Sequence, residues 1–345
     1  MKKIIRRVSE CEPGIKIAET IYNEYGGIII GEDTILDDHL IKKLKNLDIE
    51  KIKVHSQSDD EIISNDAEVF RTQYNENVQA VKEVLHDISK GNSVDMEKVN
   101  TVSESIFVRI NENRDILSCI NQIRSVDEYT YTHCVNVSLI CMLIGKWLKY
   151  PQDRIRLLVQ AGLLHDIGKG KVPPEILNKP GSLTPGEFEE IKKHAIYGYR
   201  MIENVENISK EVATAVLMHH EREDGTGYPM GAKGAQIHEF AKVIAVADIY
   251  DAMTSNRVYH EKESPFEVFE LMEKNAFGVL DHRIITTFLS NIAAYYIGDL
   301  IKLNTNQIGE IIYINPRNVS RPLIKIGEQY LDMSKSGNLK IVELF

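Results

Sequence analysis

Pairs of potential metal ligands follow directly after strongly apolar segments in the middle of this chain. Three such segments are present: 161–164 before His165-Asp166, 213–218 before His219-His220, and 245–247 before Asp248. A carboxylate or imidazole in such surroundings is costly to bury unless it is paired or bound to a metal ion. The pattern therefore predicts a polar cluster buried inside a helical core.

The histidines and aspartates of this region form a candidate ligand set: His133, His165, Asp166, His194, His219, His220 and Asp248. Imidazole nitrogen and carboxylate oxygen suit divalent iron, manganese, cobalt, nickel or zinc. No cysteine stands at a ligand spacing beside them, which argues against a structural zinc site. One histidine of this kind would more often be a core residue, but five histidines and two aspartates together favour a metal centre.

A loop that contains glycine follows each ligand pair. The loop 167–171 carries Lys169 and Lys171, which could face an anionic substrate. The loop 221–229 contains four candidate contact residues: Arg222, Gly225, Gly227 and Tyr228. Its glycines permit unusual backbone angles and close approach to a ligand, the tyrosine could stack on a base, and the arginine could pair with a carboxylate or phosphate. Taken alone, this loop would more often be an ordinary surface turn.

The charge balance limits the partners of the chain. Lys and Arg number 41 and Asp and Glu number 51, a formal net charge of −10. Such a chain lacks the basic field that neutralises a nucleic-acid backbone, so no nucleic-acid polymer is expected as a partner. An anionic small molecule would have to be bound through metal ions or a local cationic pocket.

The sequence also predicts a cytoplasmic protein without a membrane contact. The longest apolar runs, such as 135–145, contain polar residues and are shorter than a membrane span. The charged start 1–7 is not followed by the apolar core of a signal peptide. The four cysteines, Cys11, Cys119, Cys134 and Cys141, show no paired spacing. Cys134 and Cys141 are seven residues apart in an apolar helical pattern and are expected to be free buried thiols.

At 345 residues, the chain is expected to contain two or three structural units. Residues 1–60 predict a small α/β domain with a hairpin around 25–27, a helix capped by Asp37 and a strand over 51–55. Residues 61–117 predict a helical connector, because apolar residues recur at helical spacing over 66–87 and again after 99. These helices could form a homodimer contact or the first layer of the next core, and the core is favoured.

Residues 118–297 predict a helical catalytic domain, and residues 298–345 predict a short β-rich tail. The tail contains four β-prone runs, 299–303, 308–315, 323–326 and 340–344, which are separated by Asn, Gly and Pro. The expected fold class is therefore mainly α, with a small α/β unit ahead of the helices and a β-rich tail after them.

Over about 118–303, roughly half of the chain, the order of motifs resembles the HD-GYP family, the branch of the HD phosphohydrolases that degrades cyclic di-GMP. The motifs that carry the resemblance are His165-Asp166-Ile167-Gly168-Lys169, Asn178-Lys179-Pro180-Gly181, His194 with Gly198, His219-His220-Glu221-Arg222, Asp224-Gly225-Thr226-Gly227-Tyr228-Pro229, and Asp248 with Asp251-Ala252-Met253-Thr254-Ser255. Together and in this order they are specific, although each alone is not.

The resemblance implies an all-helical HD-type domain in which the seven candidate ligands bind two divalent ions, with iron or manganese favoured, and Asp166 bridges them. It implies phosphate contacts by Lys169 and Arg257, and support of the site by Asp127 and Asp251. Members that hold a third metal have a glutamate where this chain has Tyr129, so two ions are expected.

The implied reaction is the hydrolysis of cyclic di-GMP to pGpG by a hydroxide held between the metals. A second cut to GMP occurs in parts of the family, and both pGpG and GMP stay open as the end product. Asp166 and Lys169 would be the catalytic residues. The family's usual cation is replaced by His260, which would weaken phosphate binding or make it pH-dependent, or would be a bystander. Two alternatives remain: a receptor that binds cyclic di-GMP without cleaving it, and a hydrolase of another cyclic dinucleotide or of a phosphomonoester.

Overall fold

The N-terminal residues form a small α/β unit with its own hydrophobic core. The computed structural model describes residues 3–22, 28–47, 49–55, 60–112, 129–255, 264–275 and 278–344. In the N-terminal unit, two antiparallel strand pairs, a short 3-10 turn and one helix are present: β1 (Lys3–Arg7) with β4 (Lys51–His55), β2 (Ile21–Tyr22) with β3 (Ile28–Ile30), η1 (Val8–Glu10) and α1 (Asp38–Asn46).

Local sequence signals account for most of this unit. Asp37 caps α1, because its Oδ1 accepts a hydrogen bond from Leu40 N over 2.6 Å. The buried face of α1 and the inward positions of β4 close one apolar cluster around Ile17, Leu44 and Val54. The predicted hairpin strands, helix and strand over 51–55 are confirmed, whereas β1 was not predicted because its charged residues hide its alternation.

The middle of the chain is helical, so the predicted fold class is confirmed. Its helices are α2 (Asp60–Ser89), α3 (Met96–Glu112), α5 (Tyr129–Trp147), α6 (Gln152–Leu164), η3 (Ile167–Lys171), α7 (Pro174–Leu177), α8 (Pro185–Lys192), α9 (His194–Ile202), α10 (Lys210–Met218), η4 (Gly234–Gln236), α11 (Glu239–Thr254), α12 (Pro265–Asn275) and α13 (His282–Ala294). Across the ranges that the structure describes, no helix is both long and apolar enough to span a membrane.

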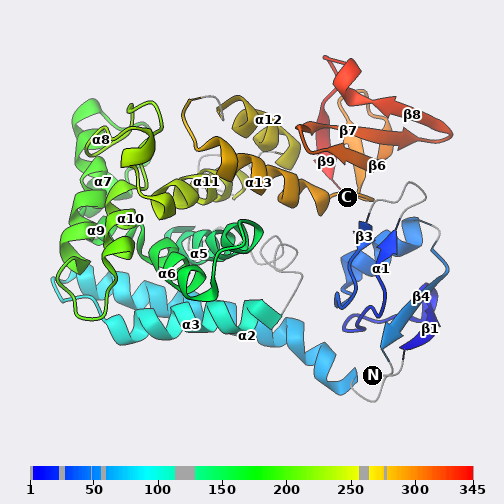
Figure 1. The fold of residues 1–345 in the computed structure, drawn as a ribbon, viewed down its shortest axis with the longest axis horizontal. Helices are drawn as coiled ribbons and strands as arrows, with labels where there is room; N and C mark the ends of the chain where they lie inside the picture. Colours follow the sequence, from blue (N-terminus) through cyan, green and yellow to red (C-terminus); the bar gives the residue numbers. More distant parts are fainter. Residues whose placement is uncertain are drawn as a thin grey trace.

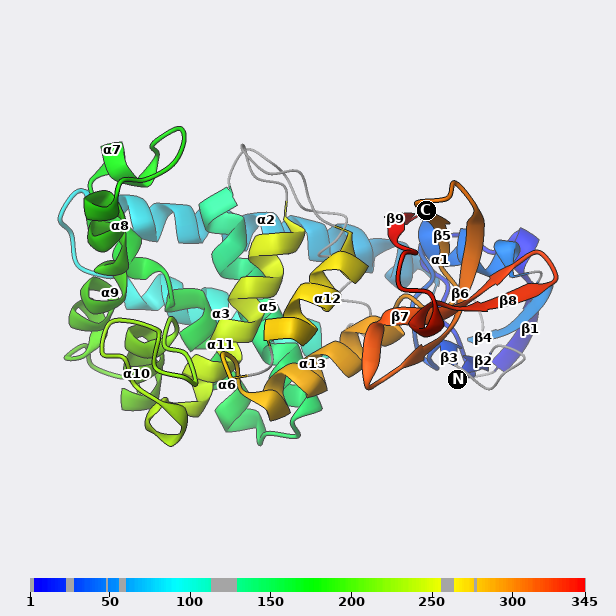
Figure 2. The same cartoon turned by 90° about the horizontal axis from the view of Figure 1, so that it is seen from above.

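Helices α5 and α11 lie in the interior of the helical body. Both are apolar on nearly every face, as expected for helices that neighbours surround. Helix α5 packs against α6, α11, α13 and α2, and α10 packs against α6, α9 and α11. These helices lie side by side in the helical body (Figures 1 and 2).

The predicted connector helices form one side of this helical body. Helix α2 runs from the N-terminal unit along the body, with α3 beside it (Figures 1 and 2). Val81 and Ile88 of α2 belong to the same hydrophobic cluster as the residues of α5 and α6. The two helices therefore form the first layer of the helical core, while a homodimer contact through them stays a prediction.

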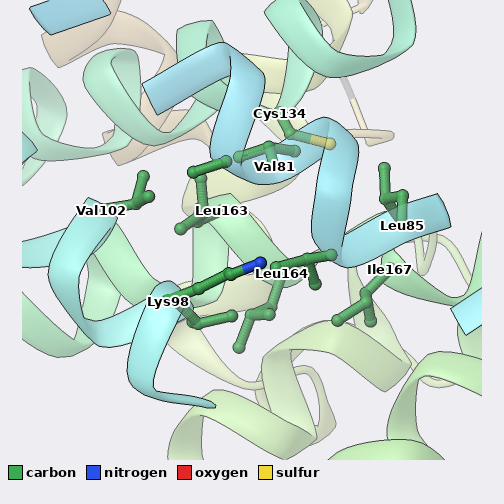
Figure 3. Close-up of a pocket in the computed structure, with 11 residues that line it drawn as sticks. Val81, Leu85, Lys98, Val102, Cys134, Leu163, Leu164 and Ile167 are labelled. Carbon is green, nitrogen blue, oxygen red and sulfur yellow. The ribbon is translucent and has the colours of Figure 1, made fainter. Parts of the chain in front are cut away.

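A small apolar cavity lies between α2 and α3 on one side and α5 and α6 on the other (Figure 3). Its volume is about 20 Å³, and its lining includes Leu85 of α2, Val102 of α3, Cys134 of α5 and Leu164 of α6. The cavity is too small for a nucleotide. It does show that α2 and α3 lie directly over residues adjacent to His133 and His165.

The C-terminal tail forms one antiparallel sheet with the strand order β8-β7-β6-β5-β9. Its strands are β5 (Leu300–Leu303), β6 (Ile308–Asn315), β7 (Asn318–Ile326), β8 (Gln329–Asp332) and β9 (Ile341–Leu344). The four predicted runs are strands, but β8 was not predicted. The sheet is fixed to α12, where Glu273 accepts hydrogen bonds from Val319 N and from the Ser320 hydroxyl.

The N-terminal unit contacts the junction between α13 and the sheet. The Nζ of Lys43 in α1 lies 3.2 Å from Asp299 Oδ1 and 3.4 Å from the Tyr295 carbonyl oxygen. Its side chain is 4% exposed and that of Asp299 is 8% exposed, so the pair is buried at the contact. His39 Nε2 lies 3.6 Å from the same carboxylate oxygen. Removing one partner of such a buried ion pair leaves the other charge buried without compensation, which lowers the stability of the fold.

We expect the stability of this contact to depend on pH through His39. The neighbouring Asp299 carboxylate raises the pKa of His39 above its ordinary value of 6.5. The folded state therefore favours the protonated form, so the stabilisation is complete below about pH 6.5 and is lost as the pH rises through the raised pKa. In urea unfolding, His39→Gln should reduce the free energy of unfolding more at pH 6 than at pH 8. His282→Gln, at an exposed histidine of α13, should show no such difference, and an equal loss at both pH values would contradict the prediction.

Candidate metal centre

The structure brings all seven candidate ligands together at the centre of the helical body. They form two adjacent groups, and within each group the ligand atoms lie within 4.8 Å of one another: Asp166, His194, His219 and His220 in one, and His133, His165 and Asp248 in the other. The carboxylate of Asp166 adjoins both groups. Its Oδ1 is 3.4 Å from His194 Nε2, and its Oδ2 is 3.2 Å from His165 Nε2.

Helix ends and two buried helices position these side chains. His165 follows α6, His219 follows α10, and His194 begins α9, whereas His133 lies on α5 and Asp248 on α11. The residue pairs therefore stand where an apolar helix stops, which is why each follows an apolar run in the sequence. Packing of α5, α6, α10 and α11 around one core then directs the side chains to a common point.

Three of the histidines share one orienting contact. The Nδ1 atoms of His165, His194 and His219 each lie 2.7–2.8 Å from the backbone carbonyl oxygen three residues earlier. A carbonyl only accepts hydrogen bonds, so each Nδ1 must carry a proton, and Nε2 is the ring nitrogen that can face a metal ion. Since metal-bound histidines usually donate their other N–H to such an acceptor, these three rings are oriented as ligands.

His133 is oriented by a carboxylate instead. Its Nδ1 lies 2.7 Å from Asp251 Oδ2, and the other Asp251 oxygen accepts from Asn136 Nδ2 over 3.0 Å. Ser255 Oγ lies 3.2 Å from the same Oδ1. Asp251, predicted to support the site, thus contacts a candidate ligand directly. Asn136 was not predicted, because nothing local in the sequence signals a contact with a residue on α11.

Burial and mutual proximity set the charges of the cluster. Burial lowers the pKa of His220 to about 3 and the pKa of His219 well below its ordinary value, so both rings are neutral. Burial opposes ionisation of Asp166, but the neighbouring His165 and Lys169 outweigh it and hold the pKa of Asp166 well below its ordinary value. Neutral imidazoles and ionised carboxylates are the forms that bind metal ions.

Two buried ligand atoms lack a hydrogen-bond partner within the part of the chain that the structure describes. They are His165 Nε2 and Asp166 Oδ1, and both are inaccessible to solvent. Such orphaned polar atoms are costly unless a ligand satisfies them. Together with the nitrogen and oxygen donor set, they fit a bound divalent metal ion, so the cluster is compatible with the predicted kind of cofactor.

Lys169 pairs with the cluster. Its Nζ lies 2.5 Å from Asp166 Oδ2, and its side chain is 25% exposed. Burial opposes its charge, but Asp166 raises the pKa of Lys169, so the ammonium stays protonated. Of the two lysines predicted to face a substrate, Lys169 therefore reaches the centre, whereas Lys171 is exposed two residues further on.

The loop after His220 is built around the buried carboxylate of Glu221. This carboxylate accepts hydrogen bonds from Met230 N over 2.7 Å and from Ala232 N over 2.9 Å. Gly227 lies so close to the start of the loop that a Cβ atom there would be 2.5 Å from the His220 carbonyl oxygen. The loop is therefore closed tightly on itself. Glu221 was quoted in a motif, but its role in closing the loop was not predicted.

The predicted contact residues of this loop lie beside the ligands. Tyr228 stacks on the His220 ring with 4.6 Å between centroids and an interplanar angle of 27°. Arg222 Nη1 donates to the Glu221 carbonyl oxygen, and Gly225 N donates to the Arg222 carbonyl oxygen. Lys192 Nζ lies 5.6 Å from the centroid of Tyr228, a second cation near the centre that was not predicted.

Several predicted residues cannot be compared with the structure. Asp127, Arg257 and His260 lie outside the described residues. Tyr129 is the first residue of α5, but its side chain is likewise outside the description. Their predicted roles stay predictions. Among the described residues, Cys134 and Cys141 are free and buried, as predicted, and so is Cys11.

The part of the chain that carries this cluster is similar to known proteins. The family model of the HD domain matches residues 115–284. The chain is 33% identical over 269 residues to a cyclic di-GMP phosphodiesterase of Pseudomonas aeruginosa, an alignment that covers 75% of this chain and 64% of that protein. It is 34% identical over 177 residues to a 3'3'-cGAMP-specific phosphodiesterase of Vibrio cholerae, covering 51% of this chain and 41% of that protein.

A solved structure has the same fold. The HDG"Y"P protein of Bdellovibrio bacteriovorus superposes with a TM-score of 0.52 at 17% identity, and the match covers 83% of this chain and 98% of that one. The chain spans less than two thirds of the length of the two curated relatives, so their activities are not transferred by similarity alone. The family match shows an HD domain over residues 115–284, and the solved structure shares the fold of this chain.

Proposed function

We propose that this chain is a metal-dependent phosphodiesterase that hydrolyses cyclic di-GMP to pGpG and then to GMP. The observation that carries the proposal is the convergence of seven ligand side chains, among them Asp166 and His165, each of which has a buried atom without a hydrogen-bond partner among the described residues. The relative from Pseudomonas aeruginosa, named as a cyclic di-GMP phosphodiesterase, supports the choice of substrate.

The two ligand groups favour two divalent ions, with iron or manganese as the first candidates. His194, His219 and His220 would hold one ion, His133, His165 and Asp248 the other, and Asp166 would be shared, because its carboxylate adjoins both groups. Bound ions of this kind supply Lewis-acid charge and lower the pKa of water, which provides a nucleophile for phosphodiester hydrolysis.

The chain's own residues would bind and orient the dinucleotide. Lys169 keeps a positive charge beside Asp166, where it would stabilise the charge that develops on a phosphate oxygen or on the leaving oxygen. Tyr228 and Arg222 lie on the loop next to His220 and would contact a base and a phosphate. These two cations would provide local positive charge for an anionic ligand in a chain whose net charge is −10.

The test is anaerobic purification with metal analysis, followed by a chromatographic hydrolysis assay with Mn²⁺ or Fe²⁺ supplied. About two ions per chain and the appearance of pGpG or GMP is the expected result. Metal-loaded protein that binds cyclic di-GMP without forming product would identify a receptor instead.

A second candidate substrate is a mixed cyclic GMP–AMP dinucleotide. The 34% identity to a 3'3'-cGAMP-specific phosphodiesterase supports this second candidate. Comparing kcat/KM for the two dinucleotides under the same conditions shows which of them is the preferred substrate. We expect cyclic di-GMP to be the better substrate, and a higher kcat/KM for the mixed dinucleotide would replace the first proposal with the second.

Replacing Lys169 tests its role apart from metal binding. Lys169→Met should lower kcat about a hundredfold, because one preorganised charge is removed from the reacting phosphate. The metal content should stay unchanged, since the loss of the ammonium frees the Asp166 oxygen that it contacts. Lys171→Met, at the exposed lysine two residues on, is the matched control and should keep full activity. Loss of metal from Lys169→Met would mean that this lysine builds the site rather than contacts the substrate.

A further inference from the structure

A chain of buried hydrogen bonds joins the connector helix α2 to the metal centre. Tyr74 of α2 donates from its hydroxyl to Asn136 Oδ1 over 2.8 Å. Asn136 of α5 donates from Nδ2 to Asp251 Oδ1 over 3.0 Å, and Asp251 Oδ2 lies 2.7 Å from His133 Nδ1. All four side chains are at least nine-tenths buried. We call these four residues, Tyr74, Asn136, Asp251 and His133, the relay.

The order of donors and acceptors fixes the direction of the relay. An ionised carboxylate only accepts hydrogen bonds, so the Asn136 atom that faces Asp251 must be the amide nitrogen. The amide oxygen then faces Tyr74, whose hydroxyl can donate to it. If Asn136 turned over, its oxygen would face the carboxylate and its NH₂ would face the hydroxyl. The carboxylate disfavours that arrangement, because it can only accept. In the observed arrangement the tyrosine hydroxyl donates to the amide oxygen and holds the amide in place.

The carboxylate in turn determines which nitrogen of His133 faces the other ligands. Asp251 accepts the Nδ1 proton, and Nε2 is directed toward Asp248 Oδ1 at 3.1 Å and Asp166 Oδ2 at 3.7 Å. Partners of metal-binding histidines fix the ring orientation and raise the basicity of the ligand nitrogen. Removing support from Asp251 should therefore weaken the metal centre without removing any ligand.

We propose that Tyr74 and Asn136 are positioning residues that set the metal affinity of the centre through Asp251 and His133. The inference deepens the proposed function and requires only that His133 is a ligand, not that cyclic di-GMP is the substrate.

Through the relay, the position of α2 would affect the metal affinity of the centre. Helix α2 leads from the N-terminal unit into the helical body (Figures 1 and 2). The side chain of Tyr74, on this helix, is buried. A shift of α2 that breaks the bond between Tyr74 and Asn136 would lower the metal affinity. The position of the connector would thus regulate how much of the protein is in the metal-loaded form.

The experiment measures Mn²⁺ binding to the metal-free full chain by calorimetry, with no nucleotide present. Tyr74→Phe removes only the hydroxyl and should raise the Mn²⁺ dissociation constant about fivefold, the effect of one lost hydrogen bond. Asn136→Ala leaves Asp251 without its amide donor and should raise it at least about tenfold. In the Asn136→Ala background, Tyr74→Phe should have no further effect, because the amide that it orients is gone.

Ser138→Ala is the matched control. Ser138 lies on the same helix as Asn136 and donates a buried hydrogen bond of 2.8 Å to the Val159 carbonyl oxygen, outside the relay. Its loss should lower the free energy of unfolding but leave Mn²⁺ affinity unchanged. The proposal is overturned if Tyr74→Phe binds Mn²⁺ like the unmodified chain, or if its effect persists in full in the Asn136→Ala background. A reduced Mn²⁺ affinity in a chain that cleaves no cyclic dinucleotide would support the relay and refute only the proposed substrate.

Discussion

Replacing Asp166 with asparagine is expected to lower the hydrolysis rate at least about a thousandfold and to remove bound metal. The amide has nearly the same size as the carboxylate, so the packing around it is kept. It carries no negative charge, however, and its NH₂ group cannot bind a metal ion. Since Asp166 adjoins both ligand groups, a single substitution should weaken both sites together. Metal content per chain and turnover of cyclic di-GMP are the two measurements.

The control for this variant is Asp153→Asn, which makes the same change of charge in the exposed first turn of α6. It should retain metal and turnover. Circular dichroism of the Asp166→Asn protein should show that its helices are intact, so that lost activity is not lost folding. Unchanged metal content and turnover in Asp166→Asn would refute the proposed centre.

The sequence predicts the candidate ligands well because each is marked by its local surroundings. His165-Asp166 and His219-His220 stand where apolar helices end, and Asp248 stands within an apolar helix. The apolar neighbours therefore indicate burial, and the residue types indicate metal-ligand chemistry. The fold class is predictable for the same reason, since long helical periods and short β-prone runs are local signals. Whether these residues bind metal stays a prediction that the experiments above test.

Residues that act through distant contacts are not predictable from one sequence. Tyr74 and Asn136 are 62 residues apart, and Asn136 and Asp251 are 115 residues apart. In the sequence, Tyr74 is one apolar position of an amphipathic helix, and only the packing of α2 on α5 gives its hydroxyl a partner. Strand β1 was not predicted because its charged residues hide the alternation of apolar and polar positions. Strand β8 was not predicted because it has only four residues, which leave little alternation to detect.

The pairing of Lys169 with Asp166 also depends on the fold. The spacing of three residues would place the two side chains on one face of an α-helix, but Asp166 lies between α6 and η3, and Lys169 lies within the 3-10 turn η3. The sequence suggested a lysine that faces the substrate. The structure adds that this lysine contacts the carboxylate that both ligand groups share, which links its role to that of Asp166.

The second large effect is expected from Gly168→Ala. A Cβ atom on residue 168 would lie 2.0 Å from the His194 carbonyl oxygen and 2.4 Å from Gly198 N. Both are backbone atoms of α9, so no side-chain rotation can relieve the overlap, and α9 must move away from η3. We expect a loss of about 3 kcal/mol in the free energy of unfolding of the metal-free protein, the upper range for overpacking of a core.

The same displacement should disturb the metal centre, because His194 begins α9 and its carbonyl is the atom that the new methyl group meets. Urea unfolding followed by the fluorescence of Trp147, with a chelator present, measures stability without the contribution of bound metal. Gly186→Ala is the matched control: a Cβ atom there meets nothing within 4 Å, and in the first turn of α8 the alanine should be neutral or slightly stabilising. If Gly168→Ala is as stable as Gly186→Ala and binds as much Mn²⁺, then the close approach of η3 and α9 is not what brings His194 to His165 and Asp166. If it loses both stability and metal, backbone contact between these two segments is a condition for the centre to form.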